Sequence, residues 1–153
     1  MNKKVKTYSL LILIGILLAY ITSQLLKLIF GNFNTFDKEK DYTFFILSVL
    51  IAPFIETFIF QYIVFKIPFS LNILKINKYS ITFLILISTI LFTFQHQYNI
   101  AYTIYAGVIG LYLAITFAYA EYIKEGLISG FKLVASIHLL LNFIAEISKL
   151  LSL

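Results

Sequence analysis

The sequence predicts an all-α, polytopic transmembrane bundle of about five spanning helices, and three observations lead to this fold class. The chain of 153 residues is 61% hydrophobic and only 12% charged, about half the charge of an average soluble domain. One soluble core of this size cannot hide so much apolar surface. The charged residues also gather in short stretches between long apolar runs, each near the roughly 20 residues that cross a bilayer.

The first two apolar runs cover residues 7–30 and 42–65. The first follows a lysine-rich start, like a signal peptide, but it is far longer than the roughly 7–15 apolar residues of a cleavable signal. We therefore expect a retained spanning helix. The second run contains Pro53, which removes a helical hydrogen bond and predicts a kink just before Glu56.

The second half of the chain supplies three more runs of spanning length. They cover residues 79–97, 100–120 and 131–151. Polar loops are predicted between the spans, at residues 66–78 and 121–130 and around the acidic and basic cluster at 37–41. With no separate soluble segment, the whole chain, residues 1–153, is expected to form a single membrane domain.

The distribution of lysine predicts a cytoplasmic N-terminus by the positive-inside rule. All 12 basic residues are lysines, and the net charge is +5. In that orientation the inner flanks carry Lys3, Lys4, Lys6, Lys66, Lys75, Lys78, Lys124 and Lys132, and the outer flanks carry Lys27, Lys38, Lys40 and Lys149. The excess is typical of cytoplasmic loops and does not indicate a nucleic-acid surface. With no cysteine, disulfides and thiolate sites are excluded.

Four polar side chains inside the predicted spans are candidates for function, because lipid offers them no partner. They are Glu56, His96, His138 and Asn142. The last two are four residues apart and share one helix face, where interhelical hydrogen bonding alone is an alternative explanation. Glu146 continues that face, and we interpret it as a snorkelling group paired with Lys149.

The expected depths of these groups agree only in part. At about 1.5 Å per residue, Glu56 and Asn142 lie roughly 15 Å from the inner boundary and His138 roughly 9 Å. His96 lies roughly 22–25 Å deep, about two helical turns too far out. Tilt, or a break in the second span, would be needed to bring it to the others.

One carboxylate, two imidazoles and one amide in a low-dielectric pocket suit the activation of water. A carboxylate can act as general base, and imidazole and amide N–H groups can stabilise an oxyanion. Two histidines and a carboxylate are also a common Zn²⁺ site. The absence of an H-E-x-x-H sequence makes the metal alternative the weaker one, and any cofactor stays open.

Three short motifs resemble those of the CPBP family (CAAX protease and bacteriocin-processing, or Abi) of intramembrane proteases. The segment APFIETFIFQ, residues 52–61, resembles the family motif A-P-x-x-E-E-x-x-x-R. The segments FTFQH, residues 92–96, and HLLLN, residues 138–142, resemble F-x-x-x-H and H-x-x-x-N. Gly107 and Gly110 fit the glycine-bearing helix between them, where we expect close helix packing.

This resemblance implies a role for each candidate residue. Glu56 would activate the attacking water and His96 would assist it, while His138 and Asn142 would hold the scissile carbonyl. Two charges of the first motif are replaced together, by Thr57 and Gln61. Losing both partners of a buried pair can be nearly neutral, and we expect the two new side chains, four apart, to hydrogen-bond instead.

The resemblance predicts an intramembrane endopeptidase in a prokaryotic cell membrane, acting on a peptide or membrane-associated substrate. Prenylated CAAX-type tails, leader peptides and bacteriocin-related targets are the substrate classes it suggests. Because the first motif is altered, the alternative is a non-catalytic membrane immunity or scaffold protein of the same fold. A small transport component is a third possibility, but the sequence lacks paired broken helices and an internal repeat.

Overall fold

The computed structural model describes residues 3–31, 42–123 and 129–151, and the secondary structure within these residues is helical. Five of its helices are long and apolar enough to cross a membrane. They are Val5–Phe30, Leu47–Ser70, Lys78–Gln95, Ile100–Tyr122 and Gly130–Ser148. The predicted all-α membrane bundle is confirmed, whereas the cytoplasmic N-terminus stays a prediction. The predicted loop at 37–41 and the side chain of Lys149 lie outside the described part.

The first, third, fourth and fifth spans are nearly uninterrupted helices. They are α1 (Lys3–Phe30), α5 (Lys78–Gln95), α6 (Ile100–Ala118) with its π-helical extension η3 (Tyr119–Ile123), and α7 (Gly130–Leu151). The start of α5 is set by Asn77, whose side-chain oxygen accepts hydrogen bonds from two backbone N–H groups of the first turn. Asn99 caps α6 in the same way, because a short polar side chain satisfies N–H groups that have no partner within the helix.

The second span alternates between α-helical and π-helical geometry. Its segments are α2 (Tyr42–Ile46), η1 (Leu47–Ile51), α3 (Ala52–Glu56), η2 (Thr57–Ile63) and α4 (Val64–Ser70). Pro53 lies in the first turn of α3, and π-helical segments flank that turn. The kink predicted just before Glu56 stays a prediction, and the structure shows instead a π-helical segment on each side of α3.

The prediction that a loop begins at Lys66 is wrong. The helix continues to Ser70 and includes Pro68, and the polar connection begins only at Leu71. Lys66 marked the boundary in the sequence because it is charged, but its Nζ pairs with the carboxylate of Glu121. A lysine with a partner can remain on a helix near the membrane boundary.

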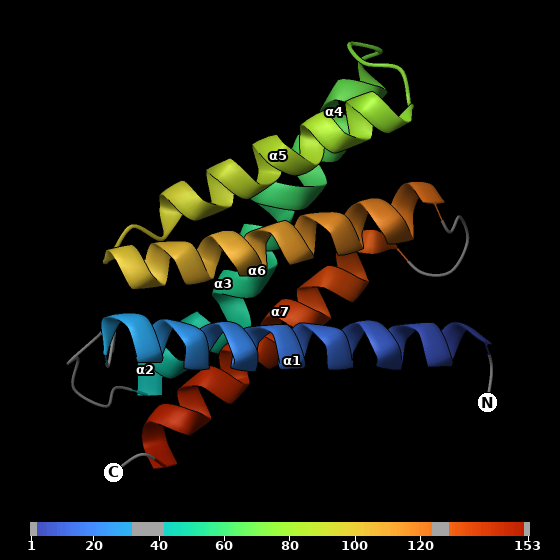
Figure 1. Ribbon diagram of the computed structural model, residues 1–153. Helices are drawn as coiled ribbons and strands as arrows, with labels where there is room; N and C mark the ends of the chain where they lie inside the picture. Colours follow the sequence, from blue (N-terminus) through green and yellow to red (C-terminus); the bar gives the residue numbers. More distant parts are fainter. Residues whose placement is uncertain (1–2, 32–41, 124–128, 152–153) are drawn as a thin grey trace.

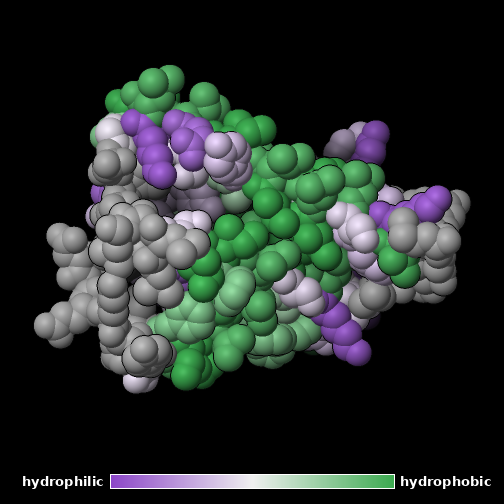
Figure 2. All heavy atoms as spheres, turned by 90° about the horizontal axis from the view of Figure 1, so that it is seen from below, coloured by the Kyte–Doolittle hydropathy of each residue, from purple (hydrophilic) through white to green (hydrophobic). Residues whose placement is uncertain are grey.

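Helix α6 forms the centre of the bundle. It packs against α1, α5 and α7, and Figure 1 shows α6 running between α1 and α5 while α7 crosses the bundle obliquely. Leu113, Ala114 and Phe117 of α6 are fully buried. In Figure 2 hydrophobic residues cover the middle of the face seen from below, and hydrophilic ones gather toward its ends, as expected for a surface that meets lipid.

Close packing between α5 and α6 depends on a glycine, as the sequence predicted. A Cβ atom at Gly110 would lie 2.7 Å from a ring carbon of Phe92, a distance that requires movement of the ring. A Cβ at Gly107 would lie 3.4 Å from Thr93 at its nearest. Gly110 thus allows Phe92 to lie against α6, and Phe92 in turn touches the candidate site.

Candidate active site

Glu56, the last residue of α3, is the point on which two histidines from other helices converge. Nε2 of His96 lies 3.6 Å from Oε2 of Glu56, and Nε2 of His138 lies 3.5 Å from the same oxygen. These separations are slightly longer than an ordinary hydrogen bond. The structure therefore brings together three of the four predicted site residues around one carboxylate oxygen.

The expected depth mismatch of His96 is wrong, for two structural reasons. Because the second span extends to Ser70, Glu56 lies roughly 20 Å from the end of its helix, close to the depth expected for His96. The helices also cross at appreciable angles (Figure 1), so residues at different positions along their helices reach a common level.

His96 ends α5 and is held by that helix in one tautomer. Its Nδ1 lies 2.7 Å from the carbonyl oxygen of Phe92, and because a carbonyl only accepts, Nδ1 carries the proton. His96 directly follows Gln95, the last residue of α5. A neutral ring in this tautomer presents a lone pair at Nε2 toward Glu56.

His138 is almost completely buried and has the opposite arrangement. Its Nδ1 has no hydrogen-bond partner among the described residues, and its Nε2 faces the Glu56 carboxylate. A proton on Nε2 is favoured, since only that nitrogen has an acceptor in front of it. The Phe92 ring packs against both histidines, with centroid separations of 4.4 Å to His96 and 5.6 Å to His138.

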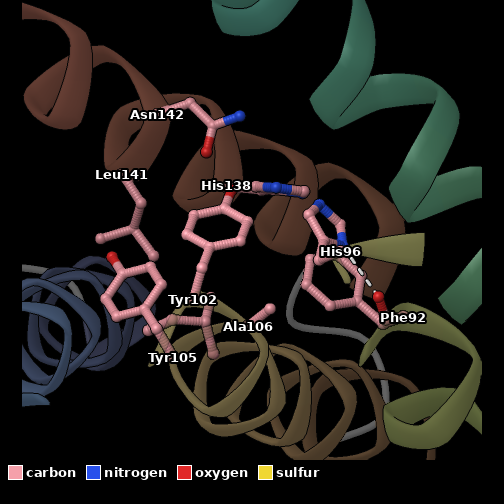
Figure 3. Close-up of a pocket in the computed structure, with 9 residues that line it drawn as sticks. Phe92, His96, Tyr102, Tyr105, Ala106, His138, Leu141 and Asn142 are labelled. Atoms are coloured by element: carbon pink, nitrogen blue, oxygen red, sulfur yellow. Dashed lines mark hydrogen bonds between the residues drawn. The ribbon is translucent and has the colours of Figure 1, made fainter. Parts of the chain in front are cut away.

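Asn142, the fourth predicted residue, lies one helical turn beyond His138 and is bonded to the second span. Its Nδ2 donates to the backbone carbonyl of Ser48 over 2.9 Å. Both Asn142 and His138 line one pocket, which confirms that they share a helix face. Figure 3 shows the rings of His96 and His138 side by side, with Asn142 farther along α7.

The pocket has a free volume of about 50 Å³, enough for a few water molecules but not for a peptide. Its lining consists of Phe92, His96, Tyr102, Tyr105, Ala106, Ile109, His138, Leu141 and Asn142. The Tyr102 ring, labelled in Figure 3, lies 6.0 Å from that of His96, centroid to centroid. Tyr102 and Tyr105 were not predicted from the sequence, although with Tyr98 they recur at helical spacing, a signal for one aromatic face.

The predicted hydrogen bond between Thr57 and Gln61 is wrong. Both side chains are fully buried, yet Oγ1 of Thr57 and both polar atoms of Gln61 have no partner among the described residues. The reason is the register of η2 (Thr57–Ile63), because a π-helix closes hydrogen bonds at i+5. Residues four apart no longer lie directly above each other, as they do in an α-helix.

The zinc alternative finds no support in the side-chain arrangement. Within residues 3–31, 42–123 and 129–151, no group of three or more His, Cys, Asp or Glu side chains is placed to hold a metal ion. Nε2 of His96 and Nε2 of His138 both approach Oε2 of Glu56. The three side chains therefore face one another directly instead of surrounding a position for an ion. We therefore derive no step through a metal.

Comparison with known families gives a match over most of the chain. The family described as type II CAAX prenyl endopeptidase Rce1-like matches residues 38–144. The chain belongs to this Rce1-like family. The match covers Glu56, His96, His138 and Asn142 and confirms the predicted resemblance to CAAX proteases. Searches of curated proteins and of solved structures each returned no match.

Membership of the Rce1-like family and the five apolar spans together identify a multi-pass integral membrane protein of a protease family. The family name describes CAAX prenyl endopeptidases. The arrangement around Glu56 combines a carboxylate with two imidazoles, and the two histidines also line a pocket with space for water.

Proposed function

We propose that this Rce1-like protein is an intramembrane endopeptidase in which Glu56 activates the attacking water. The observation that carries the proposal is the convergence of two imidazole Nε2 atoms, 3.5 and 3.6 Å away, on one oxygen of Glu56. A carboxylate so surrounded in an apolar bundle has few structural uses, and ionisable groups inside membranes usually serve function.

The proposed reaction follows from the tautomers of the two histidines. Water bound beside Glu56 gives a proton to Oε2 while its oxygen attacks the scissile carbonyl carbon. His96 assists by accepting a hydrogen bond from that water at Nε2. The Nε2–H of His138 and the second N–H of Asn142 donate to the oxyanion.

Collapse of the tetrahedral intermediate completes the reaction. The C–N bond breaks, the proton held by Glu56 passes to the leaving amine, and the new carboxylic acid then gives its remaining proton to the amine, so that a carboxylate and a protonated amine are released. The small pocket implies that the enclosing helices move apart for the substrate, because about 50 Å³ cannot accept a peptide backbone. The substrate we propose is a peptide or the tail of a membrane-associated protein, with the chain placed in a prokaryotic cell membrane.

The test is peptide cleavage by the purified protein in liposomes, analysed by mass spectrometry in ¹⁸O-labelled water. A prenylated C-terminal tail is compared with the same peptide without its prenyl group. We expect cleavage with one ¹⁸O atom in the new carboxylate, and faster cleavage of the prenylated form. If neither this pair nor a panel of leader peptides is cleaved, the proposal is wrong.

One observation favours a second candidate, a non-catalytic immunity or scaffold protein. Thr57 and Gln61 replace the paired charges of the family motif and are buried without hydrogen-bond partners. In that case a cellular immunity phenotype would persist when Glu56 is replaced by Gln, while no peptide would be cleaved.

A further inference from the structure

The backbone carbonyl of Ser48 lacks its helical hydrogen-bond donor. At the end of η1 (Leu47–Ile51), the N–H of Ala52 donates to the carbonyl of Leu47, five residues earlier. The next bond in this register would join residue 53 to the carbonyl of Ser48. Residue 53 is proline, which has no N–H, so this carbonyl is left for another donor.

Asn142 supplies that donor from a different helix. Its Nδ2 lies 2.9 Å from the carbonyl oxygen of Ser48, 94 residues away in the sequence. Only the NH₂ end of an amide can donate to a carbonyl, so the bond fixes which way the amide faces. One N–H of Asn142 is bound to Ser48, and the other remains for a ligand.

We infer that Pro53 is a positioning residue that orients the Asn142 amide by leaving the Ser48 carbonyl free. The inference rests on the proposed function, in which Asn142 binds the oxyanion. Pro53 precedes Glu56 by three residues on α3, so the turn that carries the base also begins with the residue that leaves the Ser48 carbonyl to Asn142. The proline thereby has a chemical role that is separate from bending the helix.

The test compares Pro53→Ala with Asn142→Ala in the liposome cleavage assay. Alanine restores the N–H of residue 53, which competes with Asn142 for the Ser48 carbonyl. We expect Pro53→Ala to lower kcat by about tenfold or more with little change in KM. This is the pattern expected when one donor to the oxyanion is lost. The double variant should be no slower than Asn142→Ala alone, because both changes remove one interaction.

A matched control separates the missing N–H from the proline ring. Lactic acid incorporated at position 53 has the side chain of alanine but an ester oxygen where alanine has its N–H. We expect this variant to keep near wild-type kcat. If it is as slow as Pro53→Ala, or if the losses of Pro53→Ala and Asn142→Ala multiply, the inference is wrong.

Two further outcomes are informative. If Pro53→Ala does not fold, Pro53→Gly, which restores the same N–H, takes its place in the comparison with the lactic acid variant. The proposed function is tested separately by Glu56→Gln. If Glu56→Gln is inactive while Pro53→Ala retains full kcat, only the role of Pro53 is overturned.

Discussion

Nε2 of His138 lies 3.5 Å from Oε2 of Glu56, and these two atoms join α7 to α3 at the centre of the candidate site. The Nδ1 atom of His138 has no hydrogen-bond partner in the described part of the chain. The Glu56 carboxylate is the acceptor that Nε2 of His138 faces, at a separation longer than an ordinary hydrogen bond, and it favours a proton on Nε2. In this arrangement the catalytic base and the proposed oxyanion donor depend on each other.

The first prediction concerns this dependence. His138→Ala is expected to lower kcat by about 100-fold, since one oxyanion donor is lost and Glu56 loses its partner. Added to a Glu56→Gln background, it should reduce the rate much less, because residues that act as a unit are not additive. Rates of the two single variants and the double variant in liposomes check this. Multiplicative losses would show that the two residues act independently.

The second prediction concerns the glycine beneath Phe92. Gly110→Ala places a Cβ atom 2.7 Å from the Phe92 ring and should displace a ring that contacts both histidines. We expect a loss of about 1–3 kcal/mol in unfolding free energy and a lower kcat. Gly107→Ala is the matched control, because its Cβ approaches Thr93 only to 3.4 Å. Equal effects of the two changes would contradict this account of Phe92.

The third prediction concerns the buried amide of Gln61. Both of its polar atoms lack partners within the described residues, and such a group costs about 1–3 kcal/mol. Gln61→Met, which keeps a similar volume, should therefore raise or preserve the thermal unfolding midpoint in detergent. Gln97→Met, at an exposed position, should leave it unchanged. A clear drop for Gln61→Met would mean that the amide has a partner in the protein in solution.

The fourth prediction concerns the start of α7. Glu121 pairs with Lys66 through Oε1 and accepts the backbone N–H of Gly130 at Oε2 over 2.8 Å. Glu121→Ala removes a helix cap and should cost about 1–2 kcal/mol, whereas Lys66→Ala should cost less than about 1 kcal/mol. Hydrogen exchange at Gly130 should accelerate only in the Glu121 variant. Similar exchange in both variants would mean that the ion pair, not the cap, holds the helix.

The sequence was sufficient for the membrane fold and for the residues that meet at the site. Apolar run length predicts spans, and polar side chains in lipid predict partners, so Glu56, His96 and His138 could be expected to gather. Their depths could not be matched, because Lys66 looked like the end of a span. Its pairing with Glu121 is a tertiary contact that has no local sequence signal.

The π-helical register of the second span was also beyond prediction. It separates Thr57 from Gln61 and leaves the Ser48 carbonyl for Asn142, yet the sequence shows only a proline and an apolar run. A shift between i+4 and i+5 hydrogen bonding depends on how neighbouring helices pack. The contribution of Tyr102 to the pocket was missed because interfacial tyrosine is common in membrane proteins.

The most direct test of the central claim is the single-turnover cleavage rate of Glu56→Gln. Glutamine keeps the shape of the side chain but cannot take a proton from water, so we predict a loss of about 100-fold or more. Glu146→Gln, a change of the same kind outside the cluster of Glu56, His96 and His138, should stay within about threefold of wild type. If Glu56→Gln cleaves the reporter as fast as this control, Glu56 is not the catalytic base.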